Sequence, residues 1–93
     1  MQKHTKIYLN YFDYGEQDFI PCEVCESRAV DIHHIFGRGK GMDEIWNLMA
    51  LCRKCHTRAH RQGMEYRNTL IRLHGLKLQE HEQSNSNNHK GHF

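Results

Sequence analysis

Four cysteines in two closely spaced pairs constrain the fold of this chain more than any other feature. Cys22 and Cys25 form the first Cys-x-x-Cys pair, and Cys52 and Cys55 form the second. Four thiolates satisfy the tetrahedral preference of Zn²⁺, and a Cys-x-x-Cys turn lets two sulfurs bind one ion. Disulfides and free thiols are the poorer explanations, because residues 1–10 lack the apolar stretch of a secretory signal peptide. The spacing therefore predicts a structural Zn²⁺ bound by all four cysteines.

The length and the charge distribution narrow the class of protein further. A chain of 93 residues is about one small domain, and a bound metal often stabilises domains of this size. No apolar run approaches the roughly 20 residues of a membrane span, so we expect a cytoplasmic protein that does not contact a membrane. Residues 28–77 carry ten Lys and Arg but only four acidic residues. This excess is typical of proteins that bind a phosphate backbone, although ordinary surface charge is the alternative.

The hydrophobic pattern predicts an α+β fold. Apolar residues at helical spacing predict the helices, and β-branched or alternating stretches predict the strands. In chain order these are a helix over 3–14, a strand over 28–35, a Gly-rich loop over 36–43, a turn and short strand over 44–51, a helix from 53 to a break near Gly63, and a second helix over 64–74. Gly75 is expected to end that helix. We expect one domain over residues 1–80, followed by a disordered polar tail over 81–93.

Four of the nine histidines are expected to lie near the cysteine pairs. His56 and His60 are four residues apart, so they share one face of a helix and can bind one divalent metal. His33 and His34 are adjacent in the predicted strand, where neighbouring side chains point to opposite faces. Both can serve one site only if the strand ends or bulges there. One imidazole acting as a base and others binding a metal are what phosphodiester hydrolysis requires. The histidines expected to be incidental are His4, His74, His81, His89 and His92.

The combined motif resembles the HNH endonucleases of the ββα-metal (His-Me finger) group, especially small zinc-stabilised members common in bacteriophages. The matching residues lie within 20–61 and are Cys22-x-x-Cys25, Asp31-Ile-His-His-Ile35, Asn47-Leu and Cys52-x-x-Cys55-His56-x-x-x-His60. The resemblance implies a ββα-metal domain braced by the four-cysteine zinc site, with a helix on either side. It also implies metal-dependent hydrolysis of DNA phosphodiester bonds, by nicking or by double-strand cleavage.

The resemblance also implies a role for each polar residue of the motif. His34 would be the general base that deprotonates the attacking water, and Asn47 would orient the loop and this base. One catalytic divalent metal, Mg²⁺, Mn²⁺, Ni²⁺ or Zn²⁺, would be bound by His33, His56 and His60. Many members of the family have Asp at the position of His33. With His33 there, the metal would be bound by three imidazoles, which favour a transition metal over Mg²⁺. Asp31 is a candidate to orient one of the ligands.

Six basic residues near the motif are candidates to hold the DNA backbone. They are Arg38, Lys40, Arg53, Lys54, Arg58 and Arg61. Arg67 is expected to be a solvated surface group, and Trp46 is expected to pack in the core, with base stacking as its alternative. The alternative functions are a non-catalytic zinc module that binds nucleic acid, and an interaction module in a phage or restriction assembly. A homodimer stays open, and sequence specificity is expected to be weak for so small a surface.

Overall fold

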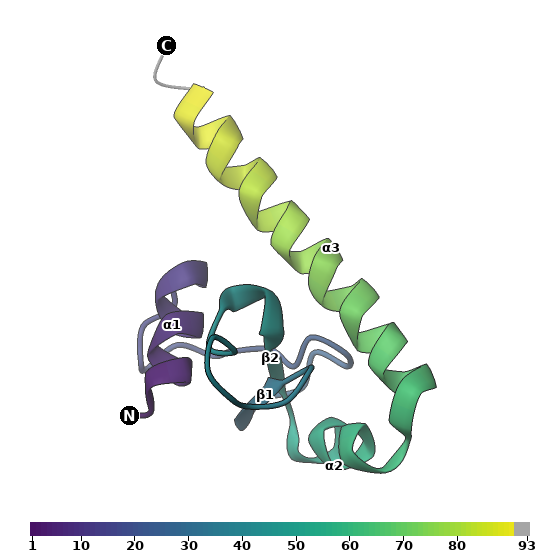
Figure 1. The fold of residues 1–93 in the computed structure, drawn as a ribbon. Helices are drawn as coiled ribbons and strands as arrows, with labels where there is room; N and C mark the ends of the chain where they lie inside the picture. Colours follow the sequence, from purple (N-terminus) through teal and green to yellow (C-terminus); the bar gives the residue numbers. More distant parts are fainter. Residues whose placement is uncertain (91–93) are drawn as a thin grey trace.

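The computed structural model describes the backbone over residues 1–90 and the side chains over residues 1–84 (Figure 1). Its elements are α1 (Lys3–Phe12), β1 (Asp31–His34), the short 3₁₀ helix η1 (Ile45–Asn47), β2 (Leu48–Leu51), α2 (Arg53–Arg61) and α3 (Gly63–Lys90). The predicted α+β class is confirmed, as are the loop over 36–43 and the short strand that follows it. None of the helices within residues 1–90 is both long enough and apolar enough to span a bilayer.

A two-stranded antiparallel sheet separates two hydrophobic cores. Side chains alternate between the faces of a strand. Met49 and Leu51 of β2 therefore pack with the cysteines and α3 on one face. Leu48 and Ala50 pack with α1 on the other face. All four side chains are fully buried, so β2 is the centre of the molecule, with the cysteines on one side and an aromatic cluster on the other.

Most element boundaries agree with the sequence-based expectation, with small differences. β1 is shorter than the predicted strand over 28–35, and Arg28 instead forms an isolated bridge with Pro21. The first helix ends at Phe12 and not at residue 14 as predicted, because Asp13 adopts a left-handed conformation with φ of 61°. The predicted break near Gly63 is confirmed, since this residue begins α3 with φ of +60°.

The expected end of the last helix at Gly75 is wrong, because α3 continues through this residue to Lys90. A glycine inside a helix costs about 1 kcal/mol relative to alanine. Contacts with α1 beyond the glycine offset this cost. The Lys77 ammonium lies 4.9 Å from the centre of the Phe12 ring, Leu78 packs on the α1 core, and the His81 ring lies 5.1 Å from that of Phe12.

Residues 81–90 thus continue α3 in place of the predicted disordered tail, whereas residues 91–93 of that tail lie outside the described residues. Figure 1 shows α3 as a long rod that passes α1 and carries the C-terminal part of the chain away from the sheet. The domain boundary at residue 80 stays a prediction.

A buried polar network connects the first cysteine pair to α1 and α3. The Glu23 carboxylate lies between Cys22 and Cys25 in sequence and accepts a 2.6 Å hydrogen bond from the Tyr8 hydroxyl. Its other oxygen lies 2.8 Å from Nδ1 of His74. The His74 side chain, which we expected to be incidental, is only 2% exposed, and Nε2 of its ring lies 2.7 Å from the Ile45 carbonyl oxygen.

Candidate functional site

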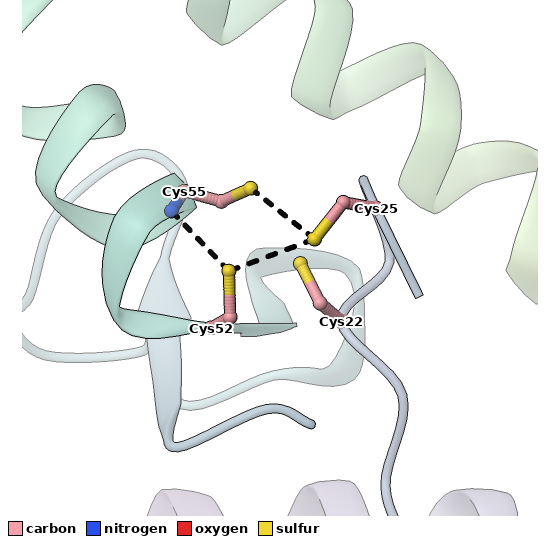
Figure 2. A group of neighbouring side chains, drawn as sticks. All are labelled: Cys22, Cys25, Cys52 and Cys55. Atoms are coloured by element: carbon pink, nitrogen blue, oxygen red, sulfur yellow. Dashed lines mark hydrogen bonds between the residues drawn. The ribbon is translucent and has the colours of Figure 1, made fainter. Parts of the chain in front are cut away.

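The four cysteine sulfurs converge on one point between the first turn of α2 and the loop that holds Cys22 and Cys25 (Figure 2). The Sγ atom of Cys25 lies 3.6 Å from that of Cys52 and 3.8 Å from that of Cys55. Sulfurs that bind one tetrahedral Zn²⁺ at about 2.3 Å are about 3.8 Å apart. Cys52 also caps α2, because its sulfur accepts a hydrogen bond from the backbone N–H of Cys55. The geometry of the four sulfurs therefore fits zinc.

The electrostatics of the cysteine cluster also favour a cation. Hydrogen bonds from the Ser27 side chain and backbone lower the pKa of Cys25 to about 6. Burial, followed by hydrogen bonds with the neighbouring thiols, raises the pKa of Cys55 to about 12, because a thiolate at this buried position is unfavourable without a positive charge beside it. Beside Cys55, the Tyr66 hydroxyl is buried, and burial followed by the neighbouring Cys55 raises its pKa to about 12. This hydroxyl could donate to a metal-bound thiolate.

A second cluster of possible metal ligands joins β1 to α2. The ring centre of His33 lies 5.0 Å from that of His56 and 5.5 Å from that of His60. The Nε2 atoms of His56 and His60 are 3.2 Å apart. Burial, followed by the neighbouring His56 and His60, lowers the pKa of His33 to about 4, so this imidazole keeps a free lone pair at neutral pH. Three nitrogens that converge in this way are a suitable donor set for a divalent transition metal.

Asp31 supports this cluster from the start of β1. Its Oδ2 atom accepts a 2.9 Å hydrogen bond from Nδ1 of His56 and lies 3.2 Å from the Arg53 guanidinium. A carboxylate that holds one nitrogen of a histidine fixes the ring and leaves the other nitrogen free to bind metal. The arrangement agrees with the ligand-orienting role considered for Asp31 from sequence.

His34 faces the opposite side of β1 from His33. Its Nε2 atom lies 2.8 Å from Oδ1 of Asp43, and its ring makes an edge contact with the His4 ring of α1, with centres 4.6 Å apart. The hydrogen bond from His34 lowers the pKa of Asp43. Sequence analysis missed both neighbours, because α1 and the loop that carries Asp43 meet His34 only in the folded chain.

Asn47 is completely buried and ties together the two ends of the Gly-rich loop. Its Oδ1 atom accepts a 2.7 Å hydrogen bond from the Phe36 N–H. Its Nδ2 group donates to the carbonyl oxygens of Gly37 and Met42, at 3.1 and 2.9 Å. The side chain therefore fixes the shape of the loop that follows His34.

Two adjoining cavities of about 280 Å³ each lie where β1 meets α2 and the start of α3. Both are lined by His33, His34 and His60, so the two faces of β1 reach a common opening. Arg38 lines one cavity and Arg67 lines the other.

The six basic residues expected to hold DNA are all exposed, but they differ in their contacts. Arg53 pairs with Asp31, and the Arg58 guanidinium lies 4.7 Å from the centre of the Tyr66 ring. Lys40, Lys54 and Arg61 lie on the surface. Arg67, which we expected to be an ordinary surface group, lies beside the histidine cluster. The expectation that Trp46 packs in the core is wrong, since this side chain is 47% exposed.

Comparison with protein families identifies a match within this chain. Residues 22–62 match the model of a family described as HNH endonuclease. Searches of curated proteins and of solved structures found no significant match. The matched segment contains the cysteine and histidine clusters, together with Asp31, Asp43 and Asn47.

Proposed function

Because residues 22–62 of this chain match the HNH endonuclease family, we propose that the protein is a metal-dependent endonuclease that hydrolyses phosphodiester bonds of DNA. The observation that carries this proposal is the convergence of His33, His56 and His60 beside His34 at one opening. A divalent metal at the three imidazoles would stabilise the negative charge that develops on the phosphate and on the leaving oxygen. The four-cysteine site holds a structural zinc in this proposal.

His34 is the proposed general base. The hydrogen bond from its Nε2–H to Asp43 leaves Nδ1 as the nitrogen that can accept a proton from water. The Asp43 carboxylate also stabilises the imidazolium that results. Asn47 acts indirectly, by holding the backbone on the C-terminal side of His34.

The basic residues would bind the phosphate backbone. Arg38 is nearest to the opening, because it lines a cavity together with His33, His56 and His60. The remaining five candidates, Arg53, Lys54, Arg58, Arg61 and Lys40, extend the positive surface along α2 and the Gly-rich loop. Such contacts give affinity that depends on salt concentration but little on base sequence.

Relaxation of supercoiled plasmid tests this proposal. Zinc-loaded protein is incubated with plasmid and with Mg²⁺, Mn²⁺ or Ni²⁺, or without added metal. We expect nicked or linear plasmid only when a divalent metal is added, and we expect His34→Ala and His56→Ala to abolish cleavage. His81→Ala is the matched control, since this histidine of α3 does not line either cavity.

Circular dichroism and zinc content must show that each variant is folded. If the wild-type protein binds plasmid but does not cut it with any of the metals, the nuclease proposal is wrong. A zinc-stabilised module that binds nucleic acid without cleaving it, or a subunit of a phage or restriction assembly, would then be the better account.

A further inference from the structure

Two large aromatic side chains are exposed next to the candidate active site. Phe36 is 45% exposed and Trp46 is 47% exposed. Their ring centres lie 5.9 Å apart with an angle of 54° between the planes. Because an aromatic side chain gains much of its stabilisation from burial, a pair left in water together is typical of a surface that binds a partner.

The backbone beneath these two rings is held rigidly by Asn47. Phe36 donates its N–H to the Asn47 side chain at 2.7 Å, and Trp46 directly precedes Asn47 in η1. Ile35, which directly precedes Phe36, donates its N–H to the Asn47 carbonyl oxygen at 2.9 Å. The two aromatic residues are therefore presented by a fixed frame and not by a free loop.

A positive charge connects the aromatic pair with the histidine cluster. The Arg67 guanidinium lies 5.7 Å from the centre of the Phe36 ring. Arg67 also lines the cavity that contains His33 and His60. A ligand that contacts the aromatic rings is thus within reach of both a cation and the proposed cleavage site.

We propose that Phe36, Trp46 and Arg67 form a binding site for an unpaired nucleobase of a DNA strand whose phosphate lies at the histidine cluster. This inference rests on the proposed function and specifies its substrate as single-stranded or locally unpaired DNA. Aromatic side chains stack on the π-face of any base. In a duplex, these faces are already covered by the neighbouring base pairs. The guanidinium adds attraction to the adjoining phosphate.

Another exposed Phe and Arg pair offers a matched comparison. Phe19 is 52% exposed, and the Arg28 guanidinium lies 5.3 Å from the centre of its ring. Among the described residues, Phe19 does not contact a second exposed aromatic ring as Phe36 contacts Trp46. Phe19 also lines neither of the two histidine cavities. Replacement of Phe19 therefore removes an equivalent ring from a different place.

Trp46 is the one tryptophan of the sequence, so its fluorescence reports directly on this site. Zinc-loaded full-length protein is titrated, without added divalent metal, with a short single-stranded oligothymidylate, with the same strand paired in a duplex, and with the corresponding oligouridylate. We expect quenching of Trp46 and tighter binding by the single DNA strand than by the duplex at equal salt. Phe36→Ala should weaken single-strand binding about tenfold, since stacking of one base contributes about 1–3 kcal/mol.

The controls separate stacking from charge. Phe19→Ala should leave binding unchanged, whereas Arg67→Gln should reduce the dependence of affinity on salt. The inference would be overturned if duplex and single strand quench Trp46 equally, or if the protein prefers the RNA strand. It would also be overturned if Phe36→Ala loses affinity equally for the single strand and for the duplex. This titration does not depend on cleavage. If single strands quench Trp46 but the protein never cuts plasmid, the base-binding site is supported and only the nuclease proposal is refuted.

Discussion

Replacement of Glu23 by Gln should strongly destabilise the protein, although it changes only one atom of the side chain. The Glu23 carboxylate is 1% exposed and His74 is 2% exposed. Both ring nitrogens of His74 face oxygen acceptors, which are the Glu23 carboxylate and the Ile45 carbonyl oxygen. Burial, followed by the neighbouring Glu23, raises the pKa of Tyr8.

The magnitude follows from the burial of the pair. Loss of one partner from a buried ion pair costs about 3–5 kcal/mol, because the other charge stays buried without compensation. Almost no solvent reaches either side chain, so screening by water does not reduce this value. A domain of this kind has about 5–15 kcal/mol of total stability, so Glu23→Gln should remove a large part of it.

Urea unfolding at a fixed concentration of free Zn²⁺ measures this effect. Glu26→Gln is the matched control, because it makes the same chemical change at an exposed position of the same cysteine loop, and it should shift the free energy of unfolding by about 0.5 kcal/mol or less. In the double variant Glu23→Gln, His74→Gln, the loss should be smaller than the sum of the single losses. If Glu23→Gln is no less stable than Glu26→Gln, the buried ion pair does not exist as described.

Three further predictions concern the metal sites and the loop. Removal of zinc by a strong chelator should unfold the chain reversibly, as followed by circular dichroism, and retention of the full spectrum would contradict a structural zinc site. Asp31→Asn should weaken binding of a divalent metal at the histidine cluster about 10- to 100-fold, at unchanged zinc content. Isothermal titration with Ni²⁺ measures this affinity, and an unaltered value would show that Asp31 does not orient His56. Asn47→Ala removes three side-chain hydrogen bonds and should cost about 2–4 kcal/mol. It should also accelerate amide exchange over residues 36–42, and slow exchange there would show that another group holds the loop.

Several features of the site could be predicted from short stretches of sequence. Cys22 and Cys25 are brought together by a single turn, and the relation of His56 to His60 depends only on helical periodicity. The break at Gly63 likewise reflects the conformational freedom of one residue. In each case the residues that decide the feature are neighbours in the chain.

The end of α3 and the exposure of the aromatic pair could not be predicted in this way. A glycine at this position often ends a helix, but Leu78 and His81 pack against α1, which lies far away in sequence. Trp46 is a large apolar residue of the kind expected in a core, yet its side chain is exposed, because the neighbouring Asn47 takes the buried position at the end of η1. The local sequence pattern does not predict which of two adjacent residues is buried and which is exposed.

By itself, the sequence determined the four cysteines that cluster, the candidate histidines and the α+β class, because each depends on residue type and on short spacings. Only the tertiary structure decided that His33 and His34 line the same two cavities, that Asp43 and His4 meet His34, and that Glu23 pairs with His74 across 51 positions of the chain. These contacts depend on how the two cores pack on the two faces of β2. Packing of this kind joins distant segments through burial and hydrogen bonding, and no local periodicity encodes it.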